Sequence, residues 1–141
     1  MKRTAAEIET LIRQGVPEAD EHGLHVEAVT SRGARVRYPF KQSMVRPGGT
    51  VAGPALMGLA DAAMYAAVLG HVDEAFGAVT AHLAIHFLRR PKPVDVVAES
   101  ELVRLGRRLA VLEVRLYSAG ESEPVALVTG SYALPGETVD A

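Results

Sequence analysis

Asp61 is the residue best placed to do chemistry in this chain, because it interrupts a long apolar segment. Between Pro54 and Leu69 the only polar side chains are those of Asp61 and Tyr65. A carboxylate in apolar surroundings must be paired, protonated or functional, since burying an unpaired charge is costly. Tyr65 lies one helical turn further along the same face, where its hydroxyl could donate to the carboxylate. Two interpretations remain open: a reactive carboxylate, or an Asp that only bonds the backbone of a neighbouring loop.

Glycines that precede this segment form a second candidate feature. Gly48, Gly49 and Gly53 leave backbone N–H groups unshielded, and Pro54 suits the first position of a helix. The dipole of a helix that begins here adds positive potential, so its start can bind an oxyanion. Simple turn and cap chemistry explains the same glycines, and both interpretations stay open.

The spacing of these two features decides whether one chain can use both. Gly53 and Asp61 are eight residues apart, which on one helix is about 12 Å at about 1.5 Å per residue. One reacting carbonyl cannot touch both groups, so joint action on one atom requires groups from different chains. Two such helices, antiparallel about a two-fold axis, would place the start of one beside the acid of the other. The spacing therefore predicts a dimer with two composite sites.

Basic residues and histidines gather near the ends and along the face of predicted strands. The basic groups are Arg89, Arg90 and Lys92 at one strand end, and Arg104, Arg107 and Arg108 at a hairpin turn. If these ends meet on one edge of the sheet, they form an anion site suited to a phosphate-bearing ligand; taken singly, they suit solvated turns. His82 and His86 share one strand face without an evident third ligand, so we expect packing there rather than a metal site.

The order of predicted elements indicates one α+β domain over residues 1–141. Periodicity and cap signals predict a short amphipathic helix over Thr4–Gln14. They also predict a long apolar helix with Gly53 at its cap, Pro54 as its first residue and Gly70 just past its end. Strands are expected over Leu24–Thr30, Ala34–Phe40, Ala78–Leu88, Val94–Leu105, Arg108–Ser118 and Pro124–Leu134, and a loop over Lys41–Gly49. Short connections make the strands antiparallel. A helix that is apolar on every face must be covered on every face, so we expect one curved sheet wrapped around it, completed by a second copy.

Composition excludes several classes of protein. The chain has 141 residues, a formal net charge of −2 and no cysteine. The charge argues against nucleic acid as a partner, and the lack of cysteine removes disulfides, thiolate nucleophiles and Cys-ligated metals. The apolar segment 51–70 is long enough to span a bilayer, but Asp61 at its centre favours a helix buried in protein. The N-terminus shows no targeting pattern, and we expect a cytoplasmic protein without a membrane partner.

Several segments together resemble one known family. The run from Ala52 to Asp61, AGPALMGLAD, resembles the helix motif of hotdog-fold acyl-CoA thioesterases of the phenylacetate-degradation (PaaI-like) type. The segments 78–80 and 85–93 are similar to the strand that follows this helix in that family. The turn at 106–110 and the closing strand at 126–132 also match, so the likeness covers most of the chain from Leu24 onward. The resemblance implies a hotdog fold, in which an antiparallel sheet wraps around a long central helix, here with a short N-terminal helix.

The resemblance also implies a role for each matching residue. Asp61 is the catalytic carboxylate, either as a nucleophile or as the base for a water, and the Gly53 amide of the other subunit polarises the thioester carbonyl. Thr80 matches a hydroxyl that helps to place the attacking water in some members, and Tyr65 falls where certain members carry another hydroxyl residue. No metal and no cofactor is implied apart from the coenzyme A of the substrate.

Two positions depart from the family pattern. The usual His-Gly-Gly reads Ala52-Gly53-Pro54, and Arg46 stands where many members have an amide side chain near the reacting centre. Arg46 could hold a carboxylate of the acyl group, pair with Asp61 or stabilise the developing oxyanion. Pairing with Asp61 would keep the acid ionised, as a nucleophile requires.

The expected function is therefore hydrolysis of acyl-CoA thioesters by a hotdog homodimer that could pair into a homotetramer. The acyl group is expected to lie along the apolar helix, and the CoA phosphates to meet arginines at the rim. The expected acyl contacts are Pro54, Leu56, Met57, Met64 and Tyr65, and the expected phosphate contacts are Arg89, Arg90, Arg107 and Arg108. The alternatives are an acyl-CoA-binding protein without turnover, a hydratase or dehydratase on the same fold, and a structural oligomer in which Asp61 is simply satisfied.

Overall fold

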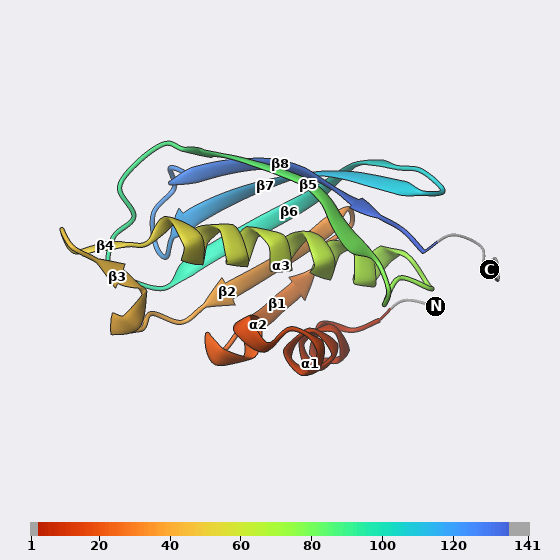
Figure 1. Cartoon of the computed structure of the whole chain (residues 1–141), viewed down its shortest axis with the longest axis horizontal. Coiled ribbons are helices and arrows are strands. Elements are labelled where there is room, and N and C mark those ends of the chain that lie inside the picture. Colours follow the sequence, from red (N-terminus) through yellow and green to blue (C-terminus); the bar gives the residue numbers. More distant parts are fainter. Residues whose placement is uncertain (1–2, 136–141) are drawn as a thin grey trace.

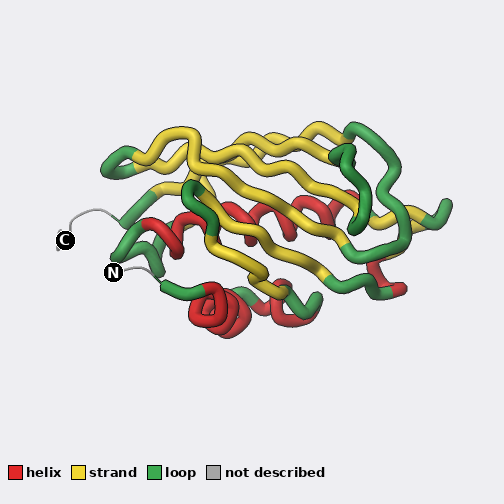
Figure 2. Tube along the Cα trace, turned by 180° about the vertical axis from the view of Figure 1, so that it is seen from behind, coloured by secondary structure: helices red, strands yellow, loops and turns green. Residues whose placement is uncertain are grey.

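Helix α3 (Gly53–His71) lies against the concave face of a six-stranded antiparallel sheet in the computed structural model, which describes residues 3–135 (Figure 1). Seen from behind, the strands of this sheet form one curved layer, and α3 lies on its other side (Figure 2). The strand order is β1-β2-β6-β7-β8-β5. The bounds are β1 His25–Val29, β2 Gly33–Tyr38, β5 Val79–Phe87, β6 Val96–Leu105, β7 Leu109–Ser118 and β8 Ala126–Ala133. This arrangement confirms the predicted α+β hotdog architecture.

Burial explains why α3 has no polar face. The sheet covers one side of the helix, and α1 (Ala5–Gly15) and α2 (Pro17–Glu21) pack near its other side, so eleven of its residues are buried. The helix is long and apolar enough to cross a membrane by composition alone, with a mean hydropathy of 1.3, but 61% of its most apolar window is buried within the fold. The structure therefore accounts for the apolar sequence by packing within the protein.

Helix α3 begins one residue earlier and ends two residues later than predicted. Ala52, rather than Gly53, is the N-cap, and the helix continues through Gly70 to His71. Gly70 is needed for close packing, because a Cβ there would lie 2.9 Å from Val29 Cγ1 on β1. A glycine near a helix end can therefore mark a tight helix–sheet contact instead of a stop signal.

The N-terminal part contains one confirmed helix and two features that the sequence pattern did not predict. The Thr4–Glu7 capping box is formed at the start of α1. The short helix α2 follows directly, and the predicted loop 41–49 contains the 3-10 helix η1 (Gln42–Met44) and much of a hairpin of β3 (Val45–Arg46) and β4 (Thr50–Val51). Elements of two to five residues are too short to give a periodic signal.

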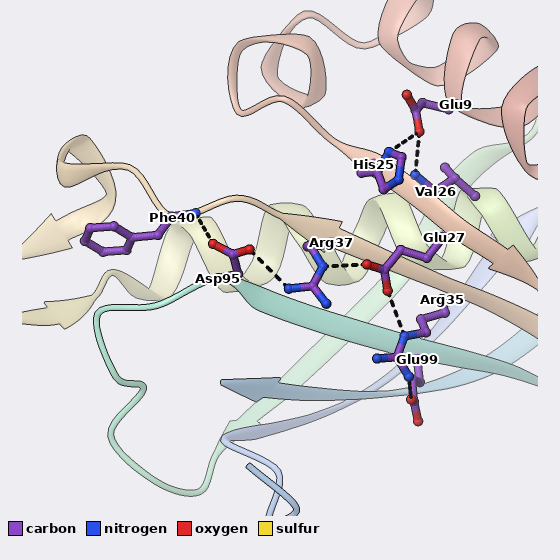
Figure 3. Close-up of polar contacts among 9 residues, drawn as sticks. All are labelled: Glu9, His25, Val26, Glu27, Arg35, Arg37, Phe40, Asp95 and Glu99. Carbon is purple, nitrogen blue, oxygen red and sulfur yellow. Dashed lines mark hydrogen bonds and ion pairs between the residues drawn. The ribbon is translucent and has the colours of Figure 1, made fainter. Parts of the chain in front are cut away.

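An ion-pair network on the outer face of the sheet fixes the route from β2 toward this hairpin (Figure 3). The Glu27 carboxylate accepts hydrogen bonds from Arg35 and Arg37, and Arg37 also pairs with Asp95 at 3.1 Å. Asp95 Oδ1 in turn accepts a hydrogen bond of 2.7 Å from the backbone N–H of Phe40. The chain that leaves β2 is thus tied to the start of β6 before it enters the hairpin.

The stability that this network contributes depends on pH through Glu27. Burial alone would raise the pKa of Glu27, but the hydrogen bonds and charges of Arg37 and Arg35 outweigh it and lower the pKa below its usual value near 4.5. A lowered folded-state pKa stabilises the fold above the unfolded pKa, and this stabilisation is lost as pH falls through the folded value. We expect Glu27→Gln to cost about 1 kcal/mol at pH 7 and to flatten the pH dependence of the unfolding free energy from about pH 5 downward.

Urea unfolding at several pH values measures this effect, and Glu74→Gln at an exposed position serves as the control. An identical pH dependence in Glu27→Gln and in the wild type would show that the network contributes nothing to it.

Gly130 lets β8 approach β5 and the side chain of Met64 closely. A Cβ at Gly130 would lie 2.7 Å from the carbonyl oxygen of His82 and 2.7 Å from Met64 Sδ. Because one of these neighbours is backbone, we expect Gly130→Ala to destabilise the protein by about 1–3 kcal/mol. Gly77→Ala, whose Cβ would meet nothing closer than Pro135 Cγ at 3.8 Å, should be nearly neutral in the same urea titration; equal stability of the two variants would contradict this packing.

Candidate functional site

The Asp61 carboxylate is held by two hydroxyl groups at the middle of α3. Its Oδ1 accepts hydrogen bonds of 2.7 Å from Thr80 Oγ1 and 2.7 Å from the Tyr132 hydroxyl. Among the described residues, no hydrogen bond or ion pair is made to Oδ2. Two donors on one oxygen stabilise the carboxylate charge, and the second oxygen is left for a substrate or a water.

Strand pairing brings these two hydroxyls together. Thr80 on β5 lies opposite Tyr132 on β8, next to an irregularity in register between Thr80 and His82. Burial, followed by the negative charge of Asp61, raises the pKa of Tyr132 far above its usual value. The phenol therefore stays protonated and remains a donor at neutral pH. Tyr132 is the site residue that sequence analysis missed, because nothing in a single strand shows which helix residue it faces.

Tyr65 does not bond Asp61, so that prediction is wrong. Its hydroxyl donates to the carbonyl oxygen of Phe76 at 2.5 Å. Its ring instead stacks on Tyr132, with centroids 5.8 Å apart and planes at 15°. Tyr65 thus contacts the residue that holds Asp61 instead of Asp61 itself.

A concave region lies at the start of α3. An open cleft of about 420 Å³ is lined by Arg46, Gly53, Phe87, Arg89 and Arg90, among others. No side chain of the described residues caps the first turn of the helix, since Ala52 offers no acceptor. Because a Cβ on Gly53 would lie 3.3 Å from Phe87 Cζ, glycine keeps this backbone close to the edge strand. The cleft therefore combines an uncapped helix start with three guanidinium groups.

Arg46 belongs to this cleft and not to the surroundings of Asp61. It lies on β3, opposite Thr50 of β4, and is exposed. No ion pair between Arg46 and Asp61 is present within residues 3–135. The predicted alternative of an Arg46–Asp61 pair is thus not formed inside one chain, whereas Arg46 and Gly53 are brought together.

The two arginine groups do not meet within one chain. Arg89 and Arg90 follow the C-terminal end of β5. Arg107 and Arg108 lie in the β6–β7 turn, next to Leu109. Leu109 and Val79 both pair with Ala133 of β8, so this turn lies at the N-terminal end of β5, where Val79 is the first residue. The nine residues of β5 separate the two groups, so the expected single anion site does not form inside the protomer.

The expected acyl contacts divide between surface and core. Met57 is 41% exposed and Pro54 is also exposed, on the side of α3 away from the core. Leu56 is buried but borders the cleft. Met64 is fully buried against Gly130, so the structure does not bring it to an accessible acyl surface.

Strand β5 forms a long exposed edge beside the Asp61 carboxylate and beside the cleft at the start of α3. Within the described chain it pairs only with β8, and Val79 and Phe87 at its ends are 60% and 55% exposed. Val79–Phe87 contains no Lys, Asp, Glu, Arg or Pro, the residues that commonly protect an edge strand from pairing. His82 and His86 lie along this edge, and no group of three potential metal ligands occurs in the described residues.

Comparison with known proteins gives one consistent family. Residues 48–125 match the model of the thioesterase superfamily. A candidate thioesterase from Silicibacter sp. TM1040 has a similar structure, with a TM-score of 0.82, 31% identity and coverage of 93% of this chain and 91% of that chain. A variant of the phenylacetic acid degradation protein PaaI from Thermus thermophilus is 28% identical, with a TM-score of 0.74 and coverage of 84% and 99%.

A curated relative agrees with these structures. A candidate esterase from Saccharolobus solfataricus is 28% identical over 116 residues, which are 82% of this chain and 76% of the relative. The Silicibacter and Saccharolobus relatives thus both bear names that denote ester or thioester hydrolysis.

The two hydroxyl donors on Asp61 generate a test of the site. Thr80→Val keeps the branched shape but removes one donor from Oδ1, so we expect kcat for the hydrolysed thioester to fall about tenfold, the value of one hydrogen bond to a charged group. Thr129→Val makes the same change at an exposed position of β8 and should leave kcat unchanged. Equal rates for the two variants would remove Thr80 from the site.

Proposed function

The chain belongs to the thioesterase superfamily, and we propose that it hydrolyses acyl-CoA thioesters to a free acid and coenzyme A. One observation carries the proposal: a carboxylate with one oxygen bound by two hydroxyls and the other open, on a helix whose uncapped start lies in an arginine-lined cleft. A carboxylate and an oxyanion-binding amide are the two groups that thioester hydrolysis needs.

Asp61 can act either as a general base or as a nucleophile. As a base, it takes a proton from water while the water oxygen bonds to the thioester carbonyl carbon; when the C–S bond breaks, the thiolate recovers that proton. As a nucleophile, Asp61 bonds to the carbonyl carbon and expels the thiolate, and water then hydrolyses the resulting anhydride. In both routes Thr80 and Tyr132 hold the carboxylate in one orientation.

The oxyanion site in this proposal comes from a second copy of the chain. Gly53 and Asp61 of one helix are about 12 Å apart, so a single carbonyl cannot reach both. Antiparallel pairing of the exposed strand β5 with its copy would set the two α3 helices side by side in opposite directions. The partner subunit's Gly53 would then face Asp61.

The same pairing explains how separated arginines could bind one coenzyme. Antiparallel β5 strands would bring Arg89 and Arg90 of one chain toward the end of the partner subunit that carries the partner's Arg107 and the partner's Arg108. Guanidinium groups suit the phosphates of CoA, and Arg46 adds positive charge to the same cleft. Pro54 and Met57, exposed on α3, would contact the acyl group. We propose a homodimer that acts in the cytoplasm without a metal.

Arg46 and Ala52 support a second candidate, an acyl-CoA-binding protein without turnover. Ala52 leaves the helix start uncapped, and Arg46 places a charge where the resembling family has an amide. Both features favour anion binding as much as they favour catalysis.

Asp61→Asn separates the two candidates. We expect it to lower kcat for release of free thiol from acyl-CoA by about 10²–10⁴-fold, because the amide can serve neither as base nor as nucleophile. KM should change little, since the carboxylate does not bind the coenzyme.

A panel of acyl-CoAs of different length and aromatic character, with thiol release as the readout, measures this effect. Tight binding without thiol release by the wild type would support the binding protein, and full activity of Asp61→Asn would remove Asp61 from the mechanism.

A further inference from the structure

A small cavity lies beside Asp61, between α2, α3, β2 and β8. It measures about 60 Å³, and its polar lining comes from Glu18, Tyr38, Asp61, Tyr65 and Tyr132. A water molecule takes about 30 Å³ in the liquid, whereas the apolar cavity that holds benzene measures roughly 150 Å³. The cavity therefore has room for water but is smaller than one that holds an aromatic ring.

Tyr38 presents a hydroxyl donor to this cavity. The residue is 1% exposed, stacks on the ring of His22 and lines the cavity, yet its hydroxyl makes no hydrogen bond to any residue in the described part of the chain. Burial, followed by the negative charges of Glu18 and Asp61, raises the pKa of Tyr38, so the phenol stays protonated. No fully buried side-chain oxygen or nitrogen of the described residues lacks a hydrogen-bond partner, so solvent reaches this hydroxyl through the cavity. Water is therefore the group that can accept a hydrogen bond from it.

Glu18 supplies the complementary acceptor. A Cβ on Gly58 would lie 2.9 Å from Glu18 Oε1 and 3.6 Å from the Tyr38 hydroxyl oxygen, so the carboxylate lies over Gly58 and next to Tyr38. No ion pair of Glu18 occurs among residues 3–135. The occupant thus meets one hydroxyl donor and the carboxylates of Glu18 and Asp61. Water, which both donates and accepts, matches this lining.

We propose that the cavity holds ordered water that Tyr38 and Glu18 orient against Asp61, and that Glu18 is thereby a positioning residue for hydrolysis. Tyr38 donates to the water, and the water donates to the two carboxylates. This fixes the hydrogen-bonding state of Asp61 without touching the coenzyme. The inference rests on the proposed thioesterase function for its kinetic consequences, but the water site itself does not.

Kinetics with a matched control test the role of Glu18. Glu18→Gln should lower kcat about tenfold with KM unchanged, and Tyr38→Phe should do the same. Because both residues act through one water, the double variant should be no slower than the slower single variant. Glu21→Gln removes the same charge from the same helix, away from the cavity lining, and should keep the wild-type kcat.

The outcomes separate the possible failures. A kcat of Glu18→Gln equal to that of Glu21→Gln, in a wild type that hydrolyses thioesters, would overturn the role of Glu18. An increase in KM without a change in kcat would also overturn it, because the cavity would then bind the acyl group. Urea unfolding shows whether each variant is folded.

A crystal structure that resolves ordered water tests the cavity even if the wild type hydrolyses no thioester, an outcome that would refute the proposed function alone. Water bonded to Tyr38 and Glu18 supports the site. An empty cavity, or a Glu18 side chain turned into solvent, refutes it.

Discussion

The charge of Asp61 inside an otherwise apolar helix is the constraint on which the rest of the site depends. The fold buries most of α3, so a carboxylate at its middle needs donors from neighbouring elements. Thr80 and Tyr132 supply them from two adjacent strands, and both donate to the same oxygen. The outcome is a carboxylate held by two donors on one oxygen, with no bond to the other oxygen among the described residues, and this supports the proposed reactive role.

The spacing of residues along α3 also constrains how two copies of the chain would assemble. The start of α3 and its central acid are too far apart to act on one atom, and each lies in its own concave region. The exposed strand β5 borders both, and it carries Thr80 near one end and Phe87, next to Gly53, at the other. An antiparallel partner along this edge would join the two halves, and the proposed dimer is thus one explanation for the separated groups and for the exposed edge.

Much of this architecture can be predicted from the sequence, because long elements carry strong periodic signals. The apolar run around Asp61 predicts α3, and the alternating patterns predict all six strands of the large sheet within a few residues. Asp61 itself is identified by chemistry, as a lone charge among apolar neighbours. The helix α2 and the β3–β4 hairpin have too few residues for such a pattern, so Glu18 was not singled out.

Contacts between strands, and contacts between strands and α3, could not be predicted from the sequence. The partner of Asp61 was expected one turn away on the same helix, at Tyr65, but the fold supplies Tyr132 from a strand 71 residues later. Such a contact depends on register, which is set by the whole sheet and not by local spacing. The predicted single anion site is wrong within one chain for the same reason, because the topology places the two groups of arginines at opposite ends of β5.

Complementation between two inactive variants tests the shared site most directly. Gly53→Pro removes the backbone N–H at the first helical residue, where Ala52 already has the extended conformation, with ψ 146°, that precedes a proline. It would be refolded together with Asp61→Asn.

Random mixing would give hybrid dimers with one intact site each, so thiol release should recover to about a quarter of the wild-type rate. Because a Cβ at Gly53 would lie 3.3 Å from Phe87 Cζ on β5, gel filtration must first show that the Gly53→Pro variant still forms dimers. A mixture of dimeric variants that is no more active than its two components would show that Asp61 and the Gly53 amide do not meet across a dimer, and would contradict the account.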